Sequence, residues 1–316
     1  MFLVSILVLS GALVLALVAS LWVEPSMPKP SPLTVACAVS TQPQPQTPEE
    51  LYLDLLKRTL TRAQVVGLYE RHTLKPGISI ISRLSPFLNP FLRRKGLELV
   101  RLKAAEVEPY MDASNFNLDR LEDGETMVGL RQLDNVQFCV TDAIHRKVPG
   151  DLIEAGAWRG GVTILMRAVL KAVGDGNRKV WVADSFEGLP AFDRERNGGG
   201  WEPGMMAVSL DEAKMNFRRY GLLDDQVRFL KGFFSDTLPA APITTLAVLR
   251  SDADLYESTR DVLNNLYPKL SVGGYAIFDD YKAGCRRAID EYRASHHITE
   301  QMLPIDSLAV YWRRER

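Results

Sequence analysis

Cysteine is scarce in this chain of 316 residues. The sequence holds three cysteines, Cys37, Cys139 and Cys285, and they lie far apart. They form no CxxC pair and no other spacing that is typical of a zinc site, and so few thiols do not make the framework of a small disulfide-rich domain. The sequence therefore argues against a disulfide scaffold and against structural zinc, and we expect buried or idle thiols.

An excess of positive charge is also lacking. The chain carries 38 Lys and Arg residues against 39 Asp and Glu residues, which gives a formal net charge of −1. Proteins that bind nucleic acid usually present a basic surplus or a basic stripe. We therefore expect no nucleic-acid partner. The 46% hydrophobic composition is sufficient for the core of one large α/β domain.

Charged side chains are absent from the first part of the chain, between Phe2 and Val23. At about 1.5 Å per residue, a helix of this length can cross a hydrocarbon core of about 30 Å. A cleaved signal peptide normally has a positive first region and a shorter apolar core. The favoured interpretation is a single-pass membrane anchor at residues 1–23, and the alternative is a cleaved segment that leads to a secretory or organellar protein. The orientation stays open, because Lys29 is the only nearby side-chain cation.

A Pro- and Gln-rich linker is expected to follow over residues 24–48, because this composition cannot bury a core. An amphipathic helix is predicted from Glu49 to Ala63, with Leu51, Leu55 and Leu56 spaced for one face. These features predict that order begins near residue 49.

Strand and helix patterns alternate in the second half of the chain. This alternation predicts βαβ units and a mostly parallel sheet with helices on both faces. In such sheets ligands bind at the carboxyl ends of the strands. The predicted strands cover residues 150–156, 179–186, 226–232, 246–252 and 273–281, and the predicted helices cover 162–173, 209–221 and 258–270, the second of them opened by a capping box of Ser209 and Glu212.

The first strand ends in the turn "EAGAWRGG", which contains Glu154, Gly156, Arg159 and Gly160. Trp158 stands where the second glycine of GxGxxG would be, so a dinucleotide site is weakly supported. An acid followed by a glycine-rich turn suits a ligand with a cationic amino group and a ribose, such as S-adenosylmethionine (SAM). A tight turn that is needed only for packing is an equal alternative.

The next two strands also end in acids. Asp184, followed by Ser185, can accept the two ribose hydroxyls of a nucleoside, or it can cap the next turn. Asp236 can bond an adenine amino group with Phe233 or Phe234 against the ring, and the alternative is a turn with core aromatics.

Three further aspartates, Asp252, Asp279 and Asp280, end the fourth and fifth strands. Carboxylates that converge at one edge repel each other, and a hard cation such as Mg²⁺ relieves this repulsion and can acidify a bound hydroxyl. Asp254 has two interpretations of equal weight: a functional ligand, or the cap of the following helix in a capping box with Glu257.

Several long motifs resemble the TylF/MycF-type macrocin O-methyltransferases: "GDLIEAGAWRGG", "VWVADSFEGLP", "YGLLDDQVRFLKGFFSDTLP", "LYEST" and "GGYAIFDDY". "YLDLLKRTLT" and "ETMVGLRQLDNVQFCV" are similar to that family too. The resemblance covers about residues 51–63 and 125–312. It implies a Rossmann-like class I methyltransferase fold with a seven-stranded sheet, and Mg²⁺-dependent methylation of a hydroxyl by SAM. It also implies that Asp252, Asp279 and Asp280 are the metal ligands.

On this resemblance we expect an N-terminal helical cover over residues 49–124 and a SAM-dependent methyltransferase domain over 125–316. Glu154, Gly156, Arg159, Gly160, Asp184, Ser185 and Asp236 are the candidate cofactor residues. Asp252 is the candidate catalytic group, with His145, His296 or His297 as other sources of a base. The acceptor is expected to be a small molecule or a sugar, and a homo-oligomer is possible.

The chain departs from the family in three ways. It has Ser251-Asp252-Ala253-Asp254 where the family usually has Leu-Asp-Gly-Asp, so that Ala253 is expected to alter the turn. Residues 72–123 lack a clear counterpart, and an anchor with a linker is foreign to antibiotic-tailoring enzymes, so a macrolide substrate is not expected. The polar insert at residues 191–206 is predicted to be a lid or an acceptor-binding loop.

Two other functions stay open. A membrane-anchored glycosyltransferase can use Asp252-Ala-Asp254 with a divalent metal, although the glycine turn and the Asp279-Asp280 pair argue against it. A binding protein that kept the fold and lost activity is the second, and the retained acids argue against it.

Overall fold

The computed structural model describes residues 47–61, 70–73, 90, 92, 94, 100–103, 124–197 and 200–316. The expected anchor at residues 1–23 lies outside these residues, as does the linker up to residue 46. Within the described part of the chain, no helix is long and apolar enough to cross a membrane. The membrane location that we expected from the sequence is therefore corrected: this structure gives it no support.

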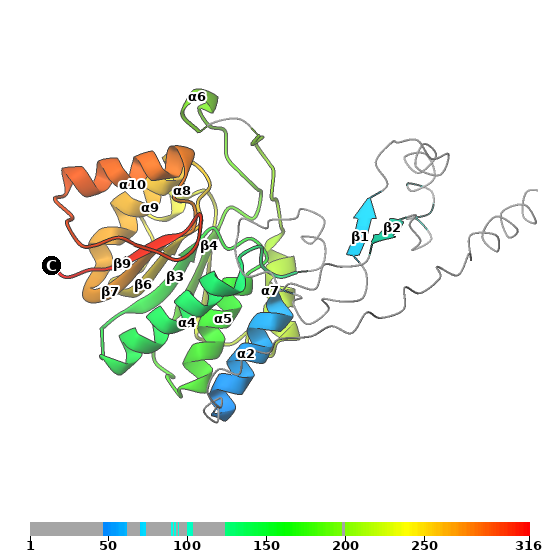
Figure 1. Ribbon diagram of the computed structural model, residues 1–316, viewed down its shortest axis with the longest axis horizontal. Coiled ribbons are helices and arrows are strands. Elements are labelled where there is room, and N and C mark those ends of the chain that lie inside the picture. The colour runs from blue at the N-terminus through cyan, green and yellow to red at the C-terminus, as the bar shows by residue number, and fades with distance from the viewer. Residues whose placement is uncertain are drawn as a thin grey trace, which may run out of the picture. The chain divides into compact units, whose positions relative to one another are not determined.

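A seven-stranded sheet forms the centre of the structure, in the order β5-β4-β3-β6-β7-β9-β8 (Figure 1). The five strands from β5 to β7 run parallel, and β9 runs antiparallel to both of its neighbours. This topology confirms the predicted class I methyltransferase fold. The strands are β3 (Asp151–Ala155), β4 (Val180–Asp184), β5 (Val227–Lys231), β6 (Leu246–Ser251), β7 (Leu270–Phe278), β8 (Leu303–Pro304) and β9 (Val310–Arg313).

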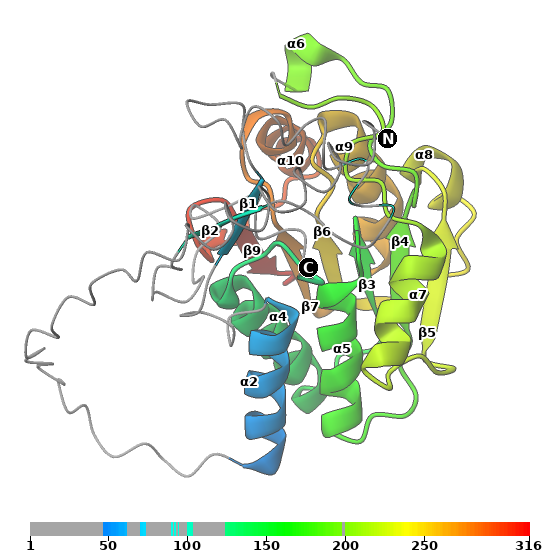
Figure 2. The same ribbon diagram turned by 90° about the vertical axis from the view of Figure 1, so that its right-hand side faces the viewer.

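Helices cover both faces of this sheet, as Figures 1 and 2 show. Side chains alternate along each strand, so Leu152 and Val248 face one core while Ile153 and Leu249 face the other. The first core packs against α2, α4, α5 and α7, and the second packs against α9 and α10. The helices are α2 (Pro48–Leu60), α4 (Leu130–His145), α5 (Gly161–Ala172), α6 (Arg194–Asn197), α7 (Leu210–Arg219), α8 (Phe234–Thr237), α9 (Tyr256–Leu266) and α10 (Ala283–Ser295).

Helix α2 confirms the helix that we predicted from residue 49, and Leu56 is buried as predicted, but the rest of its buried face differs from the prediction. The buried leucines are Leu53, Leu56 and Leu60, whereas Leu51 and Leu55 are 54% and 61% exposed. The helix starts in a full capping box, in which Thr47 accepts from Glu50 N and Glu50 accepts from Thr47 N. The N-terminal region also contains two short antiparallel strands that the sequence did not indicate, β1 (Glu70–Thr73) and β2 (Val100–Lys103).

Of the two hydrogen bonds that make a capping box, the start of α7 shows the one from the Glu212 backbone to the Ser209 side chain. Ser209 is the N-cap, and its hydroxyl accepts from Glu212 N at 3.2 Å. The Glu212 carboxylate lies 3.4 Å from Nε of Arg159. Helix α7 is thus tied to the loop that follows β3.

Candidate active site

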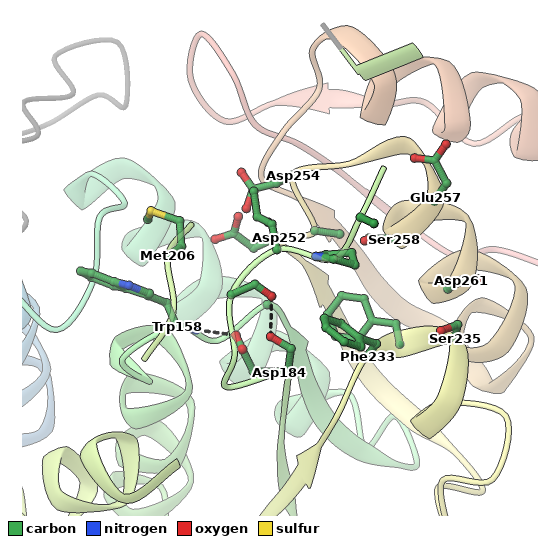
Figure 3. A pocket seen from close by; sticks show the side chains of 18 of the residues that line it. Trp158, Asp184, Met206, Phe233, Ser235, Asp252, Asp254, Glu257, Ser258 and Asp261 are labelled. Atoms are coloured by element: carbon green, nitrogen blue, oxygen red, sulfur yellow. Dashed lines mark hydrogen bonds between the residues drawn. The ribbon is translucent and has the colours of Figure 1, made fainter. Parts of the chain in front are cut away.

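A cavity of about 450 Å³ opens at the carboxyl ends of β3, β4 and β6, beside the first turns of α8 and α9. Figure 3 shows Asp252 and Asp254 close together on its wall, with Trp158 and Met206 to one side and Phe233 to the other. This is the edge at which an open α/β sheet binds ligands. Five carboxylates line the cavity: Asp184, Asp252, Asp254, Glu257 and Asp261.

The glycine turn after β3 is dictated by packing against β6. A Cβ on Gly156 would lie 1.7 Å from the Asp252 carbonyl oxygen, and the residue has a φ of +94°. Gly160 is the N-cap of α5 with a φ of +87°, and a Cβ there would meet the Phe217 ring at 3.0 Å. These close approaches support the alternative that the glycine turn after β3 is needed for packing. Gly156 also lines the cavity, whereas Gly160 does not.

Asp184 holds two loops at the floor of the cavity. Its Oδ2 accepts from Trp158 N at 2.9 Å, and its Oδ1 accepts from Phe186 N at 2.8 Å. These bonds fix two residues with positive φ, Trp158 at 47° and Phe186 at 55°. Burial raises the pKa of Asp184, against the lowering effect of these backbone donors. The next residue, Ser185, also lines the cavity and donates to Gly188 O at 2.7 Å.

Four of the candidate cofactor residues lie outside the cavity lining: Glu154, Arg159, Gly160 and Asp236. Arg159 Nη1 donates to Gly124 O at 3.0 Å, and its guanidinium lies 4.3 Å from the Trp158 ring centroid. Asp236 is an exposed residue of α8, whereas its neighbours Phe233, Phe234 and Ser235 line the cavity.

Asp252, Asp254 and Asp280 form a carboxylate cluster, in which one oxygen from each lies within 4.8 Å of the others. Burial and neighbouring carboxylates raise the pKa of Asp254 and of Asp280. Lys282 Nζ lies 2.9 Å from Asp280 Oδ1, and the buried Asp280 Oδ2 has no hydrogen-bond partner among the described residues. Carboxylate oxygens that converge in this way, one of them without a hydrogen-bond partner, are suitable ligands for a hard divalent cation.

Asp279 belongs to a neighbouring network. Its Oδ1 lies 3.2 Å from Nη2 of Arg250, an ion pair without the alignment of a hydrogen bond. Burial and the proximity of Asp252 raise the pKa of Asp279. The structure thus places Asp279 beside Asp252 and against Arg250. In the cluster with Asp252 and Asp280, Asp254 takes the position that the strand ends and the family resemblance assigned to Asp279.

Asp254 is not the cap of α9, so the capping interpretation is wrong. The N-cap is Leu255, without a side-chain bond. Asn197 takes the capping role from 59 residues away, because its Oδ1 accepts from Tyr256 N. Glu257, the expected partner of Asp254, instead accepts from Asn197 Nδ2 at 2.8 Å. No local signal in the sequence pointed to Asn197.

Ala253 does not distort the turn in the way that its departure from the family predicted. The residue with positive φ is Asp254, at 58°, and Ala253 is not among the residues of that kind. Ala253 is 6% exposed and lines the cavity. An alanine is therefore accommodated without backbone strain.

Arg250 is the functional candidate that the sequence interpretation missed. Its side chain is 1% exposed, and Nη1 donates to Glu154 and, at 3.1 Å, to Asp252 Oδ2. Glu154 is equally buried and does not line the cavity. Burial raises the pKa of Glu154 to about 7, against the lowering effect of Arg250. The signal was present as one charged residue inside the apolar run "LAVLRSD".

The three histidines that we considered as bases are exposed and line no part of the cavity. His145 ends α4, and His296 and His297 follow α10. The carboxylates are therefore the groups in the cavity wall that can accept a proton.

The insert at residues 191–206 reaches the cavity through Ala191 and Met206, and the short helix α6 is part of this insert.

Comparisons with known proteins agree with this architecture. The family model for macrocin O-methyltransferase (TylF) matches residues 49–314. The chain is 51% identical over 213 residues to demethyldecarbamoylnovobiocin O-methyltransferase of Streptomyces niveus, a match that covers 65% of this chain and 81% of the relative. It is 45% identical to 8-demethyl-8-(2,3-dimethoxy-alpha-L-rhamnosyl)-tetracenomycin-C 4'-O-methyltransferase of Streptomyces olivaceus, over 84% of this chain and 92% of the relative.

A solved structure, that of the O-methyltransferase NovP, is similar with a TM-score of 0.63 and 41% identity, over 85% of this chain and all of that one. The relatives are named O-methyltransferases, which removes the glycosyltransferase alternative. The chain belongs to the macrocin O-methyltransferase family.

Proposed function

We propose that this chain is a Mg²⁺-dependent O-methyltransferase that moves a methyl group from SAM to a hydroxyl of a sugar or of a glycosylated small molecule. The observation that carries the proposal is the carboxylate cluster of Asp252, Asp254 and Asp280 at the strand ends, of which Asp252 and Asp254 line the cavity. The sugar is proposed because the Streptomyces olivaceus relative is named for methylation at the 4' oxygen of a rhamnosyl-bearing compound.

SAM is proposed to lie over the ends of β3, β4 and β5. Gly156, Asp184 and Ser185 line this part of the cavity, and the rings of Phe233 and Phe234 can cover an adenine. Each Asp184 oxygen has a second lone pair, so it can accept a ribose hydroxyl as well as its backbone donor. Arg159, Gly160 and Asp236 lie outside the lining, and we propose that the first two act by shaping the turn.

Mg²⁺ is proposed to bind Asp252, Asp279 and Asp280. The cation, when bound, would lower the pKa of a hydroxyl and offset the repulsion between the carboxylates. Asp252 and Asp280 belong to the observed cluster, and Asp279 lies next to Asp252. Asp254 lines the cavity from the same turn as Asp252, which supports a role for it beside the acceptor hydroxyl.

The chain's own residues would then position the acceptor and remove its proton. Trp158 and Met206 would shield the reacting atoms from water. SAM, when bound, would supply the methyl group and would become S-adenosylhomocysteine as its methyl–sulfur bond breaks. Asp254 would accept the proton that the acceptor hydroxyl loses. Most of the rate would come from the alignment of the oxygen with the methyl group.

The acceptor is tested by incubating the full chain with labelled SAM, Mg²⁺ and a panel of deoxysugar glycosides and their aglycones. We expect labelled methyl on a sugar oxygen, identified by mass spectrometry, and no label on the aglycones. Label on an aglycone alone would contradict the sugar assignment. The absence of transfer to any acceptor, with SAM bound, would favour the inactive binding protein.

The roles of the aspartates are tested with two matched variants, Asp254→Asn and Asp280→Asn. A Mn²⁺ titration followed by electron paramagnetic resonance reports binding without any turnover. We expect Asp280→Asn to lose Mn²⁺ binding, and Asp254→Asn to keep Mn²⁺ while it loses methyl transfer. If Asp254→Asn loses Mn²⁺ as completely as Asp280→Asn does, Asp254 is a ligand and another group accepts the proton.

A further inference from the structure

Arg250 is a buried cation at the meeting point of three carboxylates. It lies on β6 beside Glu154 of β3, because the two residues are partners in the parallel ladder. Neighbouring partners on parallel strands point to the same face, so the Arg250 and Glu154 side chains lie together on the α4 side of the sheet. The guanidinium extends from there to the strand ends, where Asp252 and Asp279 stand.

Both terminal nitrogens of this guanidinium have defined partners. Nη1 donates to Glu154 Oε1 and to Asp252 Oδ2, while Nη2 lies 3.2 Å from Asp279 Oδ1 and donates to Gln132 Oε1 at 3.5 Å. The Gln132 amide in turn donates to Asp306 at 3.0 Å. A planar fork with several donors suits this arrangement, which the single ammonium of lysine cannot reproduce.

The charge balance shows why the site needs such a group. Asp252 and Asp279, whose side chains are 23% and 15% exposed, both lie within 3.2 Å of the Arg250 guanidinium, so their negative charges stand close together and repel each other. Arg250 keeps both carboxylates beside a fixed positive charge before any cation arrives. Glu154 is 1% exposed, and the observed partner of its Oε1 is Arg250, so it supplies a counterion that holds the guanidinium in place.

We propose that Arg250 is a positioning residue, held by Glu154, which fixes the oxygens of Asp252 and Asp279 for a divalent cation and thereby for the acceptor hydroxyl. This inference rests on the proposed metal-dependent function. It assigns Glu154 a role behind the site, in place of the direct contact with SAM that its position at the end of the first strand suggested.

The test compares Arg250→Lys with Arg167→Lys. Arg167 is a second buried arginine, 5% exposed, which pairs with Asp224 away from the cavity. Both variants keep the charge and lose the fork, so both should lower the melting temperature. We expect Arg250→Lys to weaken Mn²⁺ binding by about tenfold or more, as loss of a residue that orients metal ligands does. Arg167→Lys should bind Mn²⁺ like the wild type.

Glu154→Gln separates the two roles of Glu154, because it keeps the side-chain shape and removes the charge. We expect weaker Mn²⁺ binding, with the SAM dissociation constant within about twofold of wild type, since the carboxylate does not face the cavity. A large loss of SAM affinity with unchanged Mn²⁺ binding would overturn the inference and restore a direct cofactor contact. Wild-type Mn²⁺ binding by Arg250→Lys would also overturn it.

The wild-type titration distinguishes this inference from the proposed function. If the wild type binds no Mn²⁺, the metal site and the inference both fall. If the wild type and the folded Arg250→Lys variant bind Mn²⁺ equally, the metal site stands and the positioning role alone is refuted. Asp252 and Asp279 then hold their places without the guanidinium.

Discussion

Gly156→Ala should damage the active site through the backbone, without removing any functional side chain. Gly156 has a φ of +94°, and a Cβ there would lie 1.7 Å from the carbonyl oxygen of Asp252. No rotamer change relieves a clash with backbone, so the turn after β3 and the end of β6 must separate. Because Asp252 N also donates to Ala155 O at 2.8 Å, that separation breaks the contact that positions Asp252.

Gly174→Ala is the matched control for the size of the effect. Gly174 also has positive φ, at 72°, but a Cβ there meets nothing within 4 Å. The control should therefore lose only about 1 kcal/mol of unfolding free energy, which is the cost of placing a Cβ on a residue with positive φ. Gly156→Ala has a comparable cost from its positive φ, and the clash with Asp252 adds about 1–3 kcal/mol. The total loss of unfolding free energy should be about 2–4 kcal/mol.

Urea unfolding of the wild type and both variants measures these losses, and a Mn²⁺ titration of the folded variants reports on Asp252. We expect Gly156→Ala to be less stable than Gly174→Ala and to bind Mn²⁺ more weakly, whereas Gly174→Ala keeps wild-type Mn²⁺ affinity. Equal stability losses in the two variants, with equal Mn²⁺ affinity, would refute the claim that the close approach of Gly156 to β6 builds the site.

Two further predictions concern contacts around the site and in the scaffold. Asn197→Ala removes the cap of α9 and the donor to Glu257, so it should lower the unfolding free energy by about 1 kcal/mol in urea titrations, and an unchanged value would contradict the capping role. The bidentate hydrogen bonds from Arg167 lower the pKa of Asp224, so Asp224 adds stability above its unfolded pKa of about 3.9, and this stability is lost as the pH falls through the lower folded value. Asp224→Asn should therefore flatten the acid side of a plot of melting temperature against pH. The effect should correspond to less than about 1 kcal/mol, because the carboxylate is 40% exposed. If the variant loses melting temperature at acid pH as steeply as the wild type does, the Arg167–Asp224 pair does not contribute this stability.

The sheet and its strand ends could be predicted because their signals are local. Each predicted strand from residue 150 to 281 is present in the structure within a few residues, and Asp184 and Asp252 stand in the cavity wall as their positions suggested. The buried face of α2 could not be read in the same way. Its leucines fit more than one helical face, and packing against α5 selected Leu53, Leu56 and Leu60.

The finer structure of the site depended on contacts between distant residues. Asp254 resembled a helix cap because Glu257 follows at the right spacing, but the side chain that caps α9 is Asn197, which accepts from Tyr256 N from far along the chain. Glu154 has the position of a cofactor ligand at the end of a strand, but its observed partner is Arg250 on the neighbouring strand. Spacing alone does not reveal such tertiary partners.

Methyl transfer by metal-stripped enzyme is the most direct test of the central claim. The full chain is freed of metal with a chelator, mixed with labelled SAM and a glycoside acceptor, and assayed before and after Mg²⁺ is added, beside Asp280→Asn. We predict no transfer without Mg²⁺, full recovery when Mg²⁺ is added to the wild type, and no recovery in Asp280→Asn. Equal transfer by the wild type with and without Mg²⁺ would contradict the metal-dependent mechanism.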